Sequence, residues 1–366
     1  MEKMNPLRIG NLIALVPVVQ GGMGVGISLS GLASAVANEG GIGVISSAGL
    51  GLLYKHLGVD YISASIEGLR EEIRIAREKT KGVIGVNVMV AMSNYADMVK
   101  TAIASKADVI FSGAGLPLDL TGFLKRDSKT KLVPIVSSGR AAKIICQKWQ
   151  NEYQYLPDAI VVEGPKVGGH LGFKETQLSD ENYSLEQIVP QVITSVKEFE
   201  DKYKKQIPVI AAGGIYTGAD IKNMLALGAS GVQMGTRFVT TYECDAAEAF
   251  KNTYINAQKG DVVIIQSPVG MPGRAISNEF LERVKKGLKQ PIRCPFKCIK
   301  TCEVSSSPYC IITALYNAFK GNLKNGYAFA GANAYLANKL VSVKEIFDEL
   351  KEQYAKTLKS VSERYE

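Results

Sequence analysis

The sequence predicts an α/β fold, a parallel TIM (β/α)8 barrel that carries a C-terminal helical cap or appended lobe. Between residues 15 and 235, eight short apolar runs alternate with longer amphipathic stretches, which is the pattern of repeated βα units. Glycine-containing turns follow the seventh and eighth runs, where such barrels bind phosphate. The alternative is an open doubly wound sheet, which normally has about five or six strands and places its phosphate loop after the first strand.

The eight predicted strands are almost continuously apolar, as expected of strands that are covered on both faces. They span residues 15–20, 42–46, 83–88, 108–112, 132–137, 159–163, 207–212 and 231–234.

Helical patterns fill the segments between these strands. One apolar stripe at helical spacing consists of Ile62, Ile66, Leu69 and Ile73. Thr217 and Asp220 have the spacing of a capping box just after the seventh strand. Ser184 and Gln187 have the same spacing before that strand, although Pro190 leaves the start of this helix open.

The βα pattern stops near residue 257. We therefore expect a barrel core over residues 1–257 and a C-terminal cap or lobe over residues 258–366, made of loops and helices. Ser342 and Glu345 open the last helix with capping-box spacing. A polar insertion at 174–205 precedes the seventh strand, and the sequence does not reveal its role.

Composition excludes several classes of protein. The chain has 366 residues, of which 46% are apolar and 21% charged, so it can bury an ordinary core and is neither disordered nor fibrous. Its net charge of +8 is spread along the chain, which argues against nucleic acid as a partner. No apolar stretch approaches the roughly 20 residues that cross a bilayer. Six cysteines without a disulfide-like pattern favour the cytoplasm.

The last two strand ends suit a phosphate. In such a barrel the active site lies at the carboxyl ends of the strands. Gly213 and Gly214 follow the seventh strand, and Gly235 and Thr236 follow the eighth. Backbone without side chains lets N–H groups approach an anion, and a following helix adds positive potential. The alternative is that these glycines only permit tight turns.

Other strand ends carry polar side chains. Asn87 and Gln20 could meet the polar edge of a bound ring, or their amides could fix a loop backbone. His170, one of two histidines, follows Gly168 and Gly169. A neutral imidazole there could abstract a proton from a carbon acid or donate one, or the histidine could only stabilise the loop. In the same loop, Lys166 either stabilises negative charge or is a solvated lysine.

Four further cysteines lie close together in the sequence: Cys294, Cys298, Cys302 and Cys310. Their spacing makes a metal or iron–sulfur site conceivable, but it lacks the C-x-x-C pairs of common zinc sites, and Pro295 disfavours a helix that would align them. We expect reduced thiols that pack the cap, and no catalytic metal.

Several motifs together resemble those of the nitronate monooxygenase family, formerly called 2-nitropropane dioxygenases. They are Gln20-Gly-Gly-Met-Gly, Gly85-Val-Asn-Val-Met, Glu163-Gly-Pro-Lys-Val-Gly-Gly-His170, Ala211-Ala-Gly-Gly-Ile215 and Gln233-Met-Gly-Thr-Arg-Phe238. The FMN-dependent enoyl-acyl-carrier-protein reductases of the second type share this pattern.

The resemblance implies an FMN-binding TIM barrel. Gly22, Met23 and Asn87 would contact the flavin, and Lys166, Gly168 and Gly169 would flank it. The glycines of the last two junctions, with Thr236, would hold its phosphate, and His170 would face the substrate.

Three functions follow. The first is oxidation of small alkyl nitronates with O2 to a carbonyl compound and nitrite, with His170 as base if a neutral nitroalkane is used. The second is NAD(P)H-dependent enoyl reduction, for which the positive net charge suits an acidic carrier protein. The third is a flavin- or phosphate-ligand binding protein without turnover. Substrate and oligomeric state are not set by the sequence.

Overall fold

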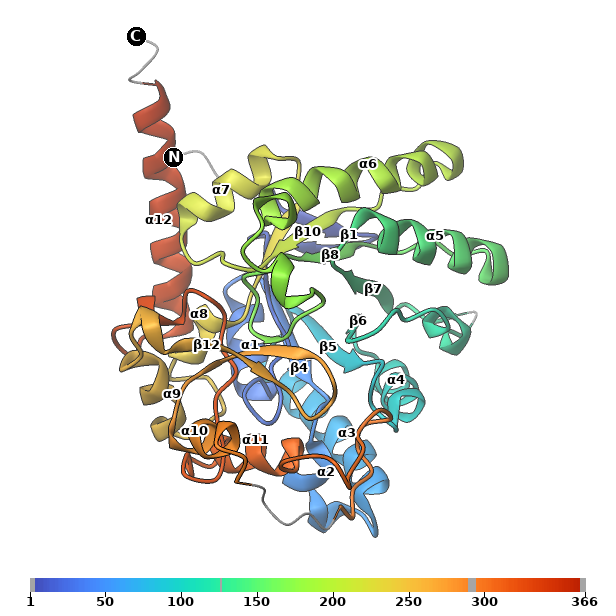
Figure 1. Cartoon of the computed structure of the whole chain (residues 1–366). Coiled ribbons are helices and arrows are strands. Elements are labelled where there is room, and N and C mark those ends of the chain that lie inside the picture. The colour runs from blue at the N-terminus through green and yellow to red at the C-terminus, as the bar shows by residue number, and fades with distance from the viewer. Residues whose placement is uncertain (1–3, 126, 289–293, 363–366) are drawn as a thin grey trace.

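The computed structural model, which describes residues 4–125, 127–288 and 294–362, contains a closed barrel of eight parallel strands (Figure 1). The strand order around the barrel is β10-β11-β3-β4-β5-β6-β7-β8, so the predicted TIM barrel is confirmed. The strands are β3 (Val18–Gln20), β4 (Ile42–Ser46), β5 (Val83–Met89), β6 (Val109–Gly113), β7 (Lys131–Val136), β8 (Ile160–Glu163), β10 (Val209–Ala212) and β11 (Gly231–Met234).

The strand register brings the predicted functional ends together. Asn87 on β5 lies opposite Ser46 on β4, and Glu163 on β8 lies opposite Ala212 on β10. Met234, the last residue of β11, lies opposite Gln20, the last residue of β3. Because all eight strands are parallel, their carboxyl ends form one rim.

The first barrel strand is shorter than predicted. Residues Leu12–Ala14 form β2, which pairs antiparallel with β1 (Leu7–Ile9) outside the barrel sheet. Leu15 is 70% exposed, and β3 begins only at Val18, after Pro17. Leu7 and Ile9 belong to the core cluster of the barrel interior, so this hairpin closes the barrel end opposite the functional rim.

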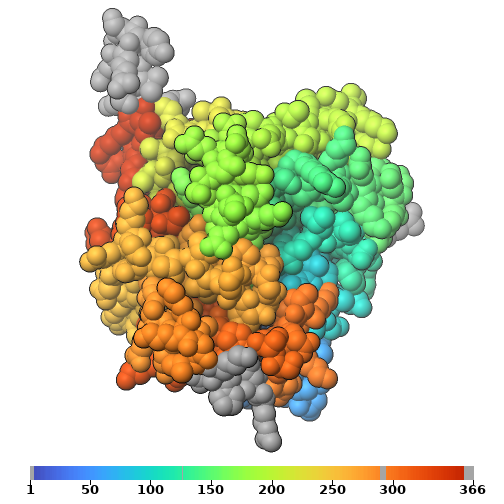
Figure 2. Space-filling model, in the orientation of Figure 1, coloured from blue at the N-terminus to red at the C-terminus, as the bar shows by residue number. Residues whose placement is uncertain are grey.

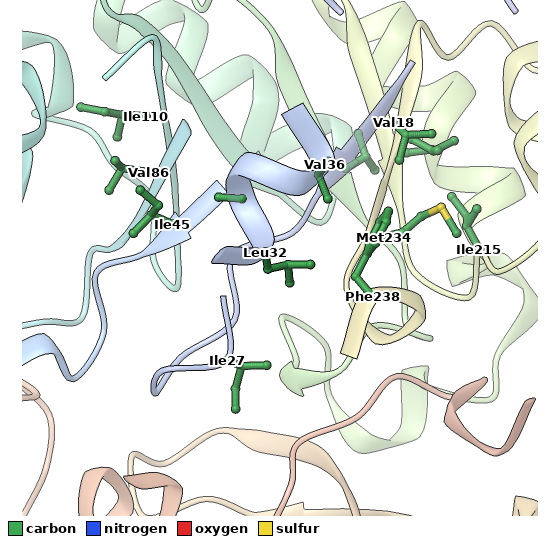
Figure 3. Packing of buried hydrophobic residues seen from close by; sticks show 14 of the residues in the cluster. Val18, Ile27, Leu32, Val36, Ile45, Val86, Ile110, Ile215, Met234 and Phe238 are labelled. Carbon is green, nitrogen blue, oxygen red and sulfur yellow. The ribbon is translucent and has the colours of Figure 1, made fainter. Parts of the chain in front are cut away.

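Helices cover the outside of the barrel, and a large apolar cluster fills the space between them and the strands. Figure 3 shows part of this cluster, in which Leu32 and Val36 of one helix lie near Val18, and Met234 lies near Phe238. The helices are α1 (Ser30–Asn38), α2 (Leu50–Leu53), α3 (Tyr61–Lys79), α4 (Tyr95–Ala104), α5 (Gly139–Tyr153), α6 (Leu185–Tyr203), α7 (Gly218–Ala226) and α8 (Thr236–Val239).

The structure confirms one of the two predicted helix caps next to the seventh strand. Thr217 and Asp220 form the predicted capping box of α7. Ser184 stands at the N-cap of α6 but makes no side-chain capping bond, and Pro190 lies inside that helix. The segment 174–205 is largely α6 itself, preceded by the short 3-10 turns η3 (Glu175–Gln177) and η4 (Glu181–Tyr183).

The C-terminal part forms a lobe and then returns to the barrel. Its β12 (Val262–Gln266) and β13 (Pro272–Ile276) form a hairpin where loops and helices were predicted, and β13 also pairs with β9 (Gly169–His170). Figure 2 shows this orange hairpin region beside the green segment that follows β8. The other elements are η1 (Lys55–Leu57), η2 (Leu120–Phe123), α9 (Glu248–Ile255), η5 (Lys259–Asp261), α10 (Glu279–Lys285), α11 (Ile311–Phe319), η6 (Ala334–Leu336) and α12 (Val343–Ser362).

The last helix, α12, packs against α7 and α1 of the barrel. Its start is capped as predicted, because the Ser342 N–H donates to the Glu345 carboxylate and the Glu345 N–H donates to the Ser342 hydroxyl. Buried Phe347 contacts Phe238, with ring centroids 6.0 Å apart. Among the described residues, no helix has both the length and the apolar character needed to traverse a bilayer.

Candidate active site

A cavity of about 560 Å³ lies at the carboxyl ends of the barrel strands, and the C-terminal lobe forms part of its wall. From the lobe, Met271, Phe329 and Asn333 reach into its wall. The structure brings together eleven of the predicted site residues in its lining: Gly22, Met23, Asn87, Lys166, Gly168, Gly169, His170, Gly213, Gly214, Gly235 and Thr236.

Gln20 is the predicted residue that does not line this cavity. Its side chain is fully buried in the barrel wall. The amide oxygen accepts a 3.0 Å bond from the Val44 N–H, and the amide nitrogen donates to the Gly21 carbonyl. Gln20 ties β3 to β4, which is the alternative that the sequence had left open, and a cofactor contact by Gln20 stays a prediction.

The junction after β10 requires glycine. Gly213 and Gly214 have φ angles of +112° and +79°, which L side chains rarely adopt. A Cβ at Gly213 would lie 2.9 Å from Val167, and one at Gly214 would lie 2.8 Å from Lys166. The backbone of this turn therefore faces the cavity without side chains.

Hydrogen bonds from the lobe hold the turns that follow β10 and β11. The Asn333 amide donates a 2.6 Å bond to the Gly214 carbonyl, and the Gly331 N–H donates a 2.9 Å bond to the Thr236 hydroxyl. Gly235 precedes Thr236 at the start of α8. These bonds hold the ends of β10 and β11 in fixed positions relative to each other, as an anion-binding cradle requires.

The loop after β8 is fixed by an arginine from the lobe. The Arg274 guanidinium donates bonds of 2.7 Å and 2.6 Å to the carbonyls of Pro165 and Val167. Burial lowers the pKa of Arg274, and a guanidinium remains charged in proteins. The same strand, β13, pairs with β9 and thereby sets the backbone of Gly169 and His170.

Gly169 leaves room for a ligand. Its φ is +76°, and no heavy atom lies within 4 Å of the place that a Cβ would occupy. By contrast, a Cβ at Gly168 would lie 2.6 Å from the backbone of Ala330 and Gly331. Gly168 therefore lets the lobe backbone pack closely, and Gly169 borders open cavity space. This arrangement suits a flat ligand that lies along the backbone of this loop.

His170 is held as a neutral imidazole. Burial lowers its pKa to about 4, well below the usual value of 6.5. Its Nε2 lies 2.7 Å from the Ser267 hydroxyl, and its ring meets Phe329 edge-on with centroids 5.0 Å apart. Ser267 and Phe329 thus fix the ring, and Nδ1 is the nitrogen that does not bond to Ser267.

Glu163 is a second titratable group in the cavity lining. It ends β8, and burial raises the pKa of its carboxyl to about 7. At neutral pH a substantial share of this carboxyl is therefore protonated and can donate a proton. Lys166, three residues further along the chain, supplies a positive charge at the same wall.

Sequence reasoning missed Ser267, Arg274 and Phe329. All three come from the lobe. Arg274 lies in β13, which pairs with β9; Ser267 lies in the turn that precedes β13; and Phe329 bridges to Ala275 of β13. The β-branched run 262–265 is typical of a strand and could have indicated the hairpin. No local pattern indicates its partner.

Three relatives show what the chain is similar to. It is 30% identical over 271 residues to the (3aS,4S,5R,7aS)-5-hydroxy-7a-methyl-1-oxo-octahydro-1H-indene-4-carboxyl-CoA dehydrogenase of Mycobacterium tuberculosis, covering 74% of this chain and 66%, just under two thirds, of that relative. It is 26% identical to a probable nitronate monooxygenase of Staphylococcus aureus, covering 77% of this chain and 81% of the relative. The structure of FabK from Thermotoga maritima superposes with a TM-score of 0.74 at 27% identity, covering 95% of this chain and 96% of FabK.

The family assignment rests on nearly the whole chain. The model of the family described as nitronate monooxygenase matches residues 7–353, which include the barrel, the cavity residues and the lobe. The chain therefore belongs to the nitronate monooxygenase family of flavin-dependent oxidoreductases.

Proposed function

We propose that this chain is an FMN-dependent nitronate monooxygenase that oxidises small alkyl nitronates with O2 to a carbonyl compound and nitrite. The observation that carries the proposal is a neutral, positioned imidazole in the same cavity as the two glycine junctions. Family membership and the motif resemblance support the same assignment.

FMN fits the residues present. Gly213, Gly214, Gly235 and Thr236 would hold its phosphate, because their backbone lies open at two adjacent strand ends. Gly22, Met23 and Asn87 would contact the ring on one side, and Lys166 with the backbone of Gly168 and Gly169 would flank it. When bound, the flavin supplies the electron acceptor for substrate oxidation and reacts with O2.

The low pKa of His170 favours a substrate that is already an anion. An imidazole whose pKa is about 4 is a weak base for the carbon-bound proton of a neutral nitroalkane. The same neutral ring can donate an N–H hydrogen bond to a nitronate oxygen. His170 therefore orients the nitronate, and Lys166 adds positive charge near it.

One observation favours a second candidate, the reduction of an enoyl thioester by NAD(P)H. Such a reaction ends with protonation of a carbon, and the Glu163 carboxyl, with a pKa of about 7, can supply that proton at neutral pH. An acyl carrier protein is the corresponding acidic partner, and the net charge of +8 suits it.

Anaerobic mixing separates the two reactions. The nitronate assignment predicts that an alkyl nitronate alone bleaches the flavin absorbance, and that nitrite appears with O2. His170→Asn should then lower turnover at least ~10-fold with FMN still bound, whereas Glu163→Gln should retain most of it.

The opposite pattern would overturn the nitronate assignment. Prompt bleaching by NAD(P)H, enoyl-thioester reduction and loss of turnover in Glu163→Gln would support the reductase. Protein that binds FMN but reacts with neither substrate would instead be the ligand-binding protein without turnover.

A further inference from the structure

A second cavity, of about 410 Å³, lies in the C-terminal lobe and is lined by all four cysteines of the cluster, Cys294, Cys298, Cys302 and Cys310. The four thiols are free. They come from the irregular segment 294–309 and from the residue that precedes α11. Four potential soft ligands therefore converge on one space, although no helix aligns them.

Backbone contacts with the barrel hold this segment in place. Ile299 forms an antiparallel bridge with Met92, and the Lys300 N–H donates a 2.9 Å bond to the Ala91 carbonyl. The Ser93 N–H donates a 3.1 Å bond to the Cys298 carbonyl. The loop after β5 thus fixes the middle of the cysteine segment, and the start of α11 fixes Cys310.

The surroundings of the sulfurs suit thiolates that bind metal. The Thr313 hydroxyl donates a 3.3 Å bond to the Cys310 sulfur, and the Ser307 hydroxyl lies 3.8 Å from the Cys302 sulfur. Among the described residues, the cavity lining also includes Lys297, Lys300 and Glu303. The Lys300 ammonium donates a 2.9 Å bond to the Val90 carbonyl of the barrel.

The four cysteines are not arranged to hold a single metal ion. In the part of the chain that the structure describes, no group of three His, Cys, Asp or Glu side chains could hold one metal ion. A tetrahedral zinc, with Zn–S bonds of about 2.3 Å, would need its sulfurs about 3.8 Å apart. A cubane cluster spaces its cysteines more widely, because each sulfur binds a different iron, and it also needs the volume of a cavity.

We propose that Cys294, Cys298, Cys302 and Cys310 ligate an iron–sulfur cluster of the [4Fe–4S] type in this second cavity. The proposal revises the expectation that these thiols only pack the cap. Cys298 does pack with Val25 and Ile312 in an apolar cluster, but it also lines the second cavity. Cys298, Ile299 and Ile311 line both cavities, so the cluster would share a wall with the proposed flavin site.

The test is the iron and acid-labile sulfide content of the full chain, prepared and reconstituted without oxygen with ferric iron, sulfide and a thiol reductant, and then desalted. We expect about four iron and four sulfide per chain, and an electron paramagnetic resonance signal after reduction with dithionite. Cys298→Ser and Cys302→Ser should each retain less than about half of that iron. The matched control is Cys146→Ser, a buried thiol in α5 that should leave the iron content unchanged.

Three results would overturn the proposal. They are wild-type protein with less than about one iron per chain, one zinc per chain without sulfide, and wild-type iron content in both cluster variants. Circular dichroism checks that each variant folds. Cys302 is partly exposed, so its variant is the informative one if Cys298→Ser proves unstable. The metal content is read without any activity assay, so it is independent of the proposed nitronate oxidation.

Discussion

Replacing His170 with asparagine should change how stability depends on pH. Burial lowers the pKa of His170 from 6.5 to about 4, so the native imidazole stays neutral at pH values where the unfolded chain binds a proton. The associated stability is fully present above pH 6.5 and is lost as the pH falls toward 4. Between pH 7 and pH 5, the free energy of unfolding of the wild type should fall by about 2 kcal/mol relative to that of His170→Asn.

Glu163 gives the opposite sign in the same cavity. Burial raises its pKa from 4.5 to about 7, so the native carboxyl retains a proton that the unfolded chain releases. This contribution is present below pH 4.5 and is lost as the pH rises through 7. Between pH 5 and pH 7, the free energy of unfolding of the wild type should therefore fall by about 2 kcal/mol relative to that of Glu163→Gln.

Urea unfolding at the two pH values, followed by the fluorescence of the buried Trp149, measures both differences. Cofactor concentration must be the same throughout, because bound ligand adds to the apparent stability. His56→Asn is the matched control at an exposed histidine and should change the free energy of unfolding by less than about 0.5 kcal/mol at pH 7. A difference between wild type and His170→Asn that is equal at both pH values would refute the reasoning.

Three further substitutions test the contacts around the site and the barrel. Ser267→Ala removes the 2.7 Å bond to His170 and should lower the free energy of unfolding by about 1 kcal/mol. It should also alter the His170 signals in ¹⁵N NMR of histidine-labelled protein, and an unchanged spectrum would contradict this. Arg274→Met leaves two buried loop carbonyls without their donor and should cost about 3 kcal/mol in urea unfolding, whereas a loss below about 1 kcal/mol would mean that the arginine does not fix the loop. Phe347→Ala leaves a cavity at a buried position of α12 and should lower the free energy of unfolding by about 3–5 kcal/mol. A negligible change in thermal unfolding would show that α12 does not complete the core.

The barrel was predictable because its strands are covered on both faces. The apolar run 42–46, for example, leaves few other assignments, and it coincides with β4. The start of the first strand was not predictable, because the apolar residues at 12–15 look the same whether they enter the barrel or form a hairpin. The exposure of Leu15 depends on β1, which supplies the pairing partner of β2.

The site was predictable where its residues are strand ends, since parallel strands bring such residues to one rim. His170, Asn87 and the glycines of the last two junctions follow from that rule. Ser267 and Arg274 do not, because they reach the site through a pairing between segments about a hundred residues apart. The partner of Gln20 could not be predicted either, because a side-chain amide can bond to backbone groups as well as to a ligand.

Comparing FMN with riboflavin tests most directly whether backbone at the ends of β10 and β11 holds the phosphate of a flavin nucleotide, as we propose. Riboflavin carries the same ring without the phosphate, so wild-type protein should bind FMN at least about 100-fold more tightly in a fluorescence titration. Gly214→Ala should remove most of that preference, whereas Gly287→Ala, at a position of similar φ (+76°) outside the cavity lining, should retain it. Equal affinity of the wild-type protein for FMN and riboflavin would contradict the account.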